Sequence, residues 1–374
     1  MTPARWARRN LFANATDSVL SALVISTGLW LVVATIHWAF GEARWDVVIG
    51  SLRVLLVGVY PADQTWRAWT AAFLLAGILG ATLGNAFPWH PFSRRGFVGA
   101  AAAAVAASAV GYAYGLFAAA LVAVPLLCWV AAMRVPHLGR WIASSWVVAV
   151  VIAFGVLAQP GLDEWGGLML SVMLTIVASA ATLPLGILLA FGRRSRIPSV
   201  RICCTGYIEV MRSVPLILVV YWIWISVPLL APDHPIPGLA RGMAGYAVFY
   251  SAYVAEYIRS GLQAVPRGQV EAARSLGMSG LSLNAEIVLP QAIRVVLPAL
   301  VGNILDIFNG ATLVFILGLT DFLRAGQMIL ADPRSGGRTY EVYAFMFVVY
   351  FAIGSAITCA ARKLEAHLSR GTRR

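Results

Sequence analysis

A polar segment between two strongly apolar stretches contains the residues whose types and spacing are most informative. The patterned residues are Glu271, Ala272, Ala273, Gly277, Ile287, Leu289 and Pro290. Ala272 and Ala273 are small enough to let another surface approach the backbone closely, and Glu271 offers a carboxylate to a basic partner. This combination predicts contact with a second protein.

The segment is expected to contain a short helix over residues 269–276, with Leu276 as its last residue. Gly277 suits the left-handed position that commonly follows a helix. Such a helix, inserted into a cleft on a moving partner, would transmit force to the apolar stretches on either side. A plain loop with a capped helix and no docking role is the alternative.

The second part of the segment is also expected to take part in docking. Ile287, with Leu281 and Leu283, would form an apolar edge that fills a groove on the partner. Pro290 would begin the next helix, where its missing N–H costs nothing.

Two carboxylates, Glu256 and Asp306, lie within apolar stretches. Charge inside a membrane is expensive, and it usually faces a cavity or a charged partner. One interpretation is that both line a translocation path, where a carboxylate meets a substrate ammonium. The other is pairing between helices, such as Glu209 or Glu256 with Arg212 or Arg259.

The amino-acid composition indicates which kind of fold holds these residues in place. The chain has 374 residues, of which 60% are hydrophobic and 12% are charged, whereas soluble domains carry about 25% charged residues. An all-α polytopic membrane protein is therefore expected. The predicted spans cover residues 19–40, 66–87, 141–158, 168–191, 207–230, 243–258, 292–319 and 342–361, with a break expected in 292–319.

Two further regions complete the predicted topology. Residues 97–133 contain no charged side chain, and one helix of that length would measure about 55 Å, against about 30 Å of bilayer core. We therefore expect two spans there, with a turn near residues 111–115. Residues 45–60, which include Asp46 and Arg53, are expected to form an interfacial helix.

The basic residues test this count of ten spans. They are grouped at Arg5, Arg8 and Arg9, at Arg94 and Arg95, at Arg134 and Arg140, at Arg193, Arg194 and Arg196, and after residue 361. With both termini cytoplasmic, every group falls on the cytoplasmic side, as the positive-inside rule requires. The same count places the docking segment, about residues 266–290, on that side.

The net charge of +12 is explained by these groups, so nucleic acid is not an expected partner. Domain boundaries are expected at 1–166, an N-terminal region of about five spans, and 167–374, a five-span core. The scattered histidines and cysteines predict neither a metal site nor a disulfide framework. Lys363 is the only lysine and follows no glycine-rich turn, so the chain supplies no Walker A lysine.

The full pattern, E-A-A-x3-G-x9-I-x-L-P, resembles the EAA loop of ABC-importer permeases, on which an ATPase docks. Residues 207–217, 251–269 and 289–298 resemble the polar-amino-acid branch of the binding-protein-dependent permeases. The resemblance covers about residues 167–362. The N-terminal extension resembles that of the larger "M" permease (AapM type) of general L-amino-acid importers, which pair with a "Q" permease.

The resemblance implies a permease subunit, not an enzyme, that moves L-amino acids across a bacterial inner membrane. Its implied partners are a second permease in a heterodimer, two copies of an ABC ATPase, a periplasmic amino-acid-binding protein and membrane lipid. The chain itself would need no cofactor, because the ATPase uses ATP and Mg²⁺. The residues implied in ATPase coupling are Glu271, Ala272, Ala273, Leu276, Gly277, Ile287 and Pro290.

One departure concerns the possible substrate pathway, for which we single out Glu256, Asp306, Asn309 and Thr312. The family usually has a lysine where this chain has Asn309, so any role of that lysine in binding or gating does not carry over to this position. An ion-coupled secondary transporter of small polar solutes is the alternative function, although no inverted repeat is visible. A membrane enzyme would need a catalytic constellation, and none is apparent.

Overall fold

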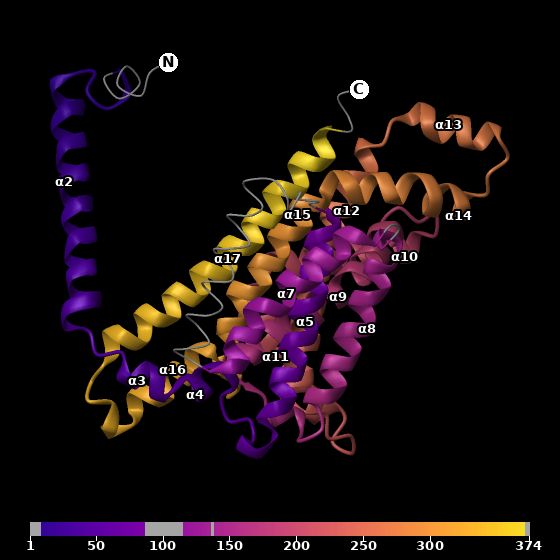
Figure 1. The fold of residues 1–374 in the computed structure, drawn as a ribbon. Helices are drawn as coiled ribbons and strands as arrows, with labels where there is room; N and C mark the ends of the chain where they lie inside the picture. Colours follow the sequence, from indigo (N-terminus) through magenta and orange to yellow (C-terminus); the bar gives the residue numbers. More distant parts are fainter. Residues whose placement is uncertain (1–8, 87–114, 136–137, 371–374) are drawn as a thin grey trace.

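The computed structural model describes residues 9–86, 115–135 and 138–370, and helices make up almost all of its regular structure (Figure 1). The N-terminal helices are α2 (Ala15–His37), α3 (Asp46–Gly50), α4 (Leu52–Val57), α5 (Thr65–Ala86), α7 (Leu116–Arg134) and α8 (Gly139–Leu157). The C-terminal helices are α9 (Gly167–Gly192), α10 (Pro198–Ser213), α11 (Leu216–Leu230), α12 (Gly238–Ala264), α13 (Arg267–Ser275), α14 (Gly280–Ser282), α15 (Leu289–Gly310), α16 (Phe322–Ala331) and α17 (Thr339–Arg370). The all-α prediction is confirmed, apart from the two-residue strand β1 (Thr320–Asp321).

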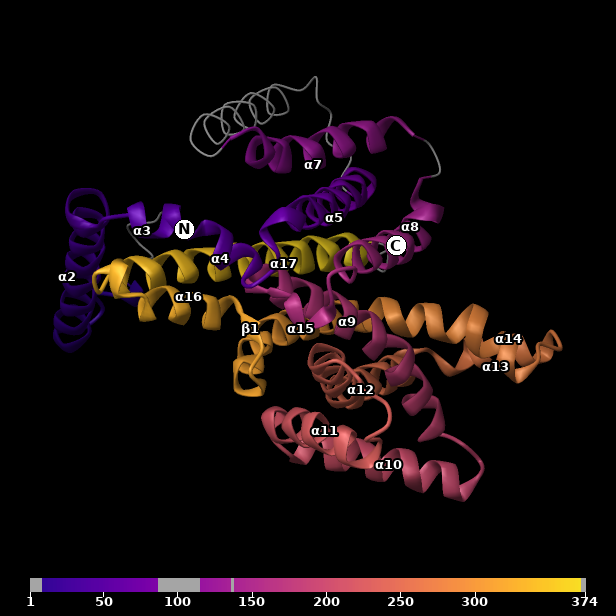
Figure 2. The same cartoon turned by 90° about the horizontal axis from the view of Figure 1, so that it is seen from below.

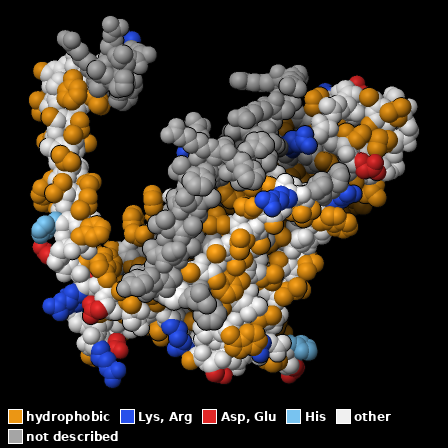
Figure 3. Space-filling model, viewed as in Figure 1, with side chains coloured by type: hydrophobic (Ala, Val, Ile, Leu, Met, Phe, Trp, Pro, Cys, Tyr) orange, Lys and Arg blue, Asp and Glu red, His pale blue; other side chains and the backbone are white. Residues whose placement is uncertain are grey.

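Six helical segments in the described part are long and apolar enough to cross a membrane, or seven when the bent pair α10–α11 is included. They include the predicted spans near residues 19–40, 66–87, 141–158, 168–191 and 342–361. The first of the two spans predicted within 97–133 lies outside the described residues, and the second corresponds to α7. Figure 3 shows hydrophobic side chains over the middle of the bundle and charged side chains toward its two ends.

Helix α12 lies at the centre of the C-terminal core, in contact with α9, α11 and α15 (Figure 2). Two glycines allow the close approach: a Cβ added at Gly186 would lie 2.5 Å from Val254, and one at Gly261 would lie 2.5 Å from the Ala292 carbonyl oxygen. Because α12 is enclosed by other helices, it can carry polar residues that a lipid-facing span could not. That explains how the span predicted at 243–258, which lies within α12, can contain Glu256 and four tyrosines although α12 is not among the six apolar segments.

The span predicted at 207–230 is not a single helix. The chain instead forms α10 and α11, which are bent by 112° relative to each other. Val214 is extended, with φ −102° and ψ 141°, because Pro215 disfavours helical backbone in the residue before it and lacks an N–H to continue the ladder. Pro215 therefore marks a sharp bend within the predicted span.

The span predicted at 292–319 changes its helix type where a break was expected: α15 ends at Gly310, and a 3₁₀ helix, Ala311–Leu317, follows directly. The interfacial helix predicted at 45–60 is present as two short helices, α3 and α4. Helix α16 was not predicted. It is short and lies beside α3 and α4 at one end of the molecule (Figure 1).

The junction between the two predicted domains is closely packed. Trp165 Nε1 and the Tyr60 hydroxyl both donate to the carbonyl oxygen of Leu157, at 3.0 and 3.1 Å. Gly166 pairs with Thr320 as an isolated parallel bridge. A Cβ added at Gly58 would lie 2.6 Å from Gly166 Cα. The N-terminal region is thereby fastened to the strand that precedes α16.

The beginning of α2, the end of α17 and α13 lie at one end of the molecule, while α3, α4 and α16 lie at the other (Figure 1). Helix α2 stands apart from the bundle, and none of its residues is buried. Throughout, we call the first of these ends the loop end.

Candidate functional site

The docking segment forms a short helix at the loop end, between α12 and α15. Helix α13 covers Arg267–Ser275, close to the predicted 269–276. Gly277 has φ +78°, its N–H donates to the Arg274 carbonyl at 2.9 Å, and the Met278 N–H donates to the Ala273 carbonyl at 3.2 Å. These two bonds form a Schellman motif, which fixes where the helix ends and how the chain leaves it.

The segment presents a mixed surface to the outside. Ala273 is buried at 2% exposure and joins the core beneath, whereas Glu271 and Ala272 are exposed. Leu276 and Leu281 are 83% and 82% exposed, which is unusual for leucines beyond the ends of the membrane helices. No other described residue pairs with the Glu271 carboxylate. The loop therefore offers two apolar side chains and a free carboxylate.

The predicted apolar edge is only partly correct. Leu283 is 4% exposed, and Ile287 is partly buried against the core, so both face the protein itself. The cause is local: residues 283–288 form a π-helical turn that continues into α15, and these side chains are on its inner face. Pro290 lies in the first turn of α15, as predicted.

A cavity of about 410 Å³ lies between α12 and α15. Its lining is aromatic and polar and consists of Leu216, Phe249, Tyr250, Tyr253, Tyr257, Asn303, Asp306, Asn309, Gly310 and Leu313. The structure thus brings Asp306 and Asn309 together. Thr312 does not line the cavity, and its hydroxyl donates to the Asn309 carbonyl at 2.9 Å.

The cavity carries one carboxylate and no basic side chain. The Asp306 carboxylate has no hydrogen-bond or ion-pair partner among the described residues, although the Tyr250 hydroxyl donates to the Asp306 backbone carbonyl at 3.1 Å. The Tyr246 hydroxyl donates likewise to the Gly310 carbonyl, so these tyrosines supply donors to carbonyls near the end of α15. Such a site attracts a cation.

Glu256 is placed differently. Its carboxylate accepts hydrogen bonds from Arg193 at 3.0 Å and from Arg259, and Arg212 lies 3.9 Å away. It does not line the cavity. Of the two carboxylates predicted within apolar stretches, Glu256 therefore forms the ion pairs of the second interpretation, and Asp306 has no partner among the described residues.

Some of these residues were not singled out from the sequence. Tyr246, Tyr250, Tyr253 and Tyr257 lie on one face of α12 with helical spacing, and that stripe is readable in the sequence. Arg193 was noted only as part of a basic group. Its partners, Glu209 and Glu256, are far from it in sequence and could not be inferred.

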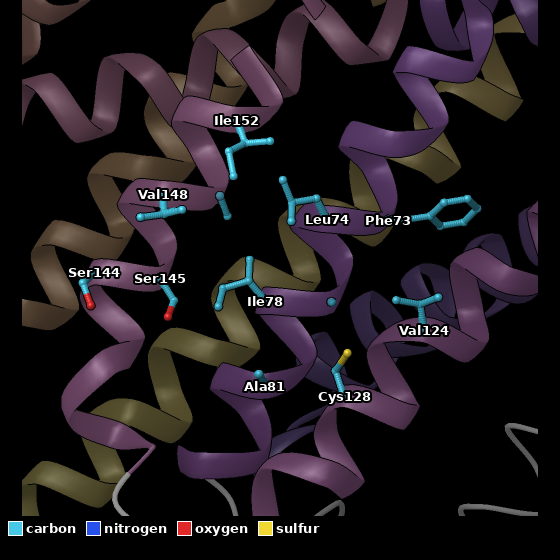
Figure 4. Close-up of a pocket in the computed structure, with 12 residues that line it drawn as sticks. Phe73, Leu74, Ile78, Ala81, Val124, Cys128, Ser144, Ser145, Val148 and Ile152 are labelled. Atoms are coloured by element: carbon cyan, nitrogen blue, oxygen red, sulfur yellow. The ribbon is translucent and has the colours of Figure 1, made fainter. Parts of the chain in front are cut away.

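A second cavity of about 520 Å³ lies in the N-terminal region, between α5, α7 and α8 (Figure 4). Its lining is mainly apolar, with Ser144, Ser145 and Cys128 as its polar side chains. In Figure 4, α5 separates α7 from α8, and side chains from all three helices surround the space. None of the predicted site residues lies here.

A polytopic helical bundle with an exposed loop at one end and a cavity among its central helices has the architecture of a membrane permease. Residues 182–370 match the family described as binding-protein-dependent transport system inner membrane component. The chain belongs to this family, the permeases of ABC transporters.

Some relatives are similar to this chain over nearly its whole length, including the N-terminal region that precedes the family match. The inner membrane amino-acid ABC transporter permease protein YhdY of Escherichia coli strain K12 is 33% identical, over 98% of this chain and 93% of its own length. The glutamate/glutamine/aspartate/asparagine transport system permease protein BztC of Rhodobacter capsulatus is 29% identical, over 99% and 94%. A crystal structure of an amino acid ABC transporter with histidines is 28% identical, with a TM-score of 0.48, over 63% of this chain and 100% of that one.

Proposed function

We propose that this chain is a permease subunit of an ABC importer that moves L-amino acids across a bacterial inner membrane. The observation that carries the proposal is the loop of residues 266–290, whose Glu271, Leu276 and Leu281 are exposed together at one end of a membrane bundle. The names of the similar proteins support amino acids as the substrate class. The loop end, with both termini, would face the cytoplasm.

The loop would dock in a groove of a separate ATPase. Leu276 and Leu281 would enter the groove, because burying exposed leucines on association is favourable. Glu271 would meet a basic side chain, while Ala272 permits close approach. Ala273, Gly277, Ile287 and Pro290 would keep the loop in shape and joined to α12 and α15.

The proposed assembly supplies what this chain lacks. Its only lysine, Lys363, follows no glycine-rich turn, so hydrolysis of ATP with Mg²⁺ would take place in two copies of the ATPase. A second permease subunit would complete a heterodimer, and a periplasmic binding protein would deliver the amino acid. Membrane lipid would cover α2 and the outer faces of the bundle.

The substrate would pass through the cavity between α12 and α15. Asp306 would meet the substrate ammonium, and Tyr250, Tyr253 and Tyr257 would contribute ring faces that attract a cation. Asn309 would offer an amide where relatives place a lysine. Glu256 and Thr312 would act outside the cavity lining.

The substitution Leu276→Asp tests the proposal, because a charge cannot enter an apolar groove without losing its water. We expect loss of ATPase copurification and of ATP-driven uptake in membranes that retain normal amounts of the permease. Glu286→Gln, an exposed carboxylate of the same loop, serves as the matched control and should change neither. An intact, active complex with Leu276→Asp would contradict the proposal.

The unpaired Asp306 carboxylate is the one observation that favours an ion-coupled secondary transporter instead, since such carriers use membrane carboxylates. The same experiment separates the two functions. Uptake that persists with Leu276→Asp in cells depleted of ATP, and that follows an ion gradient, would support the carrier.

A further inference from the structure

Five charged residues from three helices form a cluster, here called the arginine–glutamate cluster, toward the loop end of the core. They are Arg193 at the end of α9, Glu209 and Arg212 on α10, and Glu256 and Arg259 on α12. Arg193 joins the helices, because its guanidinium donates to Glu256 at 3.0 Å and to Glu209 at 3.1 Å. A single side chain thus holds α10 and α12 to the end of α9.

The cluster is partly shielded from solvent. The side chains of Arg193 and Glu256 are 25% and 21% exposed, so each charge depends on its partners more than a surface ion pair would. Glu256 alone is shared by three guanidinium groups. Neutralising it would leave Arg193, Arg212 and Arg259 close together with a single remaining carboxylate, Glu209.

The cluster lies next to the cavity. Glu256 is flanked on α12 by Tyr253 and Tyr257, both of which line the cavity. The Arg212 guanidinium lies over the ring of Tyr253, 5.8 Å from its centroid. A movement of the cluster would therefore move cavity-lining rings directly.

The cluster is also close to the docking loop in the chain. Arg259 lies little more than one turn before Ala264, where α12 ends, and α13 begins at Arg267. On the other side, α10 is joined to α11 through the sharp bend at Val214 and Pro215. Helix α10 can therefore swing at this bend while α12 follows the loop.

We propose that the arginine–glutamate cluster is the lock that couples the docking loop to the cavity, on the side formed by Tyr253 and Tyr257, which we call the mouth. Its ion pairs hold α10 against α12 in this conformation, and they exchange partners when the loop moves with the ATPase. Arg193, Glu209 and Glu256 are thus positioning residues that control the mouth without contacting the substrate. The inference rests on the proposed function, since it assigns the regulation of that same path.

The test measures amino-acid uptake and ATP hydrolysis in proteoliposomes that contain the complete complex with its binding protein. Glu256→Gln keeps the shape of the side chain and removes its charge. Because a hydrogen bond to a charged group is a strong interaction, we expect uptake per ATP hydrolysed to fall about tenfold while the ATPase stays bound. ATP hydrolysis without binding protein should rise, because the mouth no longer resists movement.

Matched variants separate positioning from simple destabilisation. Glu256→Asp should restore most of the coupling, and Arg196→Gln, in the same basic group but without an ion pair in the described structure, should leave it unchanged. The double variant Arg193→Gln with Glu256→Gln should lose less coupling than the two single effects would give if they added, because the Arg193–Glu256 pair is already lost in each single variant.

The result with Glu256→Gln can be distinguished from the result with Leu276→Asp, which tests docking of the ATPase. Loss of the ATPase with Leu276→Asp concerns the loop alone, whereas the lock predicts a bound ATPase with poor coupling. The inference is overturned if an intact Glu256→Gln complex keeps the original ratio of uptake to hydrolysis, or if the two single effects simply add.

Discussion

At the scale of single residues, Asp306 is the side chain that the surrounding protein leaves without a partner. It lies in a cavity with three tyrosines and no basic side chain, and an intramembrane carboxylate usually faces a cavity or a charged partner. Glu256 shows the opposite case, since three arginines surround it. Of two carboxylates that look alike in the sequence, Asp306 has no partner among the described residues, and Glu256 is engaged within the protein.

This difference predicts the effect of Asp306→Asn. The substitution retains the size of the side chain and removes its charge, so we expect uptake of the transported L-amino acid, whose ammonium Asp306 would meet, to require about tenfold more substrate. The measurement is the concentration dependence of uptake in proteoliposomes. Glu164→Gln, an exposed carboxylate at the opposite end of the molecule, is the control. Unchanged uptake with Asp306→Asn would show that the substrate does not meet this carboxylate.

At the scale of elements, the sequence predicts helices better than it predicts bends. The span predicted at 207–230 contains Pro215, and no rule of composition says whether a proline kinks a span or breaks it. Helix α16 was missed because it is too short to resemble a span. By contrast, Gly277 predicted the end of α13 correctly, because a left-handed residue has few substitutes.

The glycine that ends α13, Gly277, provides a prediction about the shape of the docking loop. Gly277→Val forces a β-branched residue to φ +78°, at a cost of about 1–2 kcal/mol, and should loosen the Schellman motif. We expect weaker binding of the ATPase in a pull-down assay, with unchanged thermal stability of the membrane core. Gly280→Val is the matched control, because Gly280 lies in open space without a positive φ. Equal binding by the two variants would mean that the shape of the helix end is unimportant.

At the scale of the whole molecule, the sequence predicted which segments lie at the same end of the bundle. It did not predict which helices contact one another. The basic groups and the apolar lengths were sufficient to place α13 at the same end as the beginning of α2 and the end of α17 (Figure 1). The pairing of Arg193 with Glu256 and the packing of Gly58 on Gly166 join residues far apart in the chain. Such contacts depend on which helices become neighbours, and periodicity along a single helix does not encode that.

The most direct test of the account is photo-crosslinking in the assembled complex. A photoreactive amino acid placed at Leu276, at the tip of the loop, should form a covalent adduct with the ATPase subunit, identified by mass spectrometry. The same residue placed at Tyr340, which is 78% exposed at the opposite end of the molecule, should form none. Adducts at 276 alone are the predicted result, and an ATPase adduct at 340 with none at 276 would contradict the account.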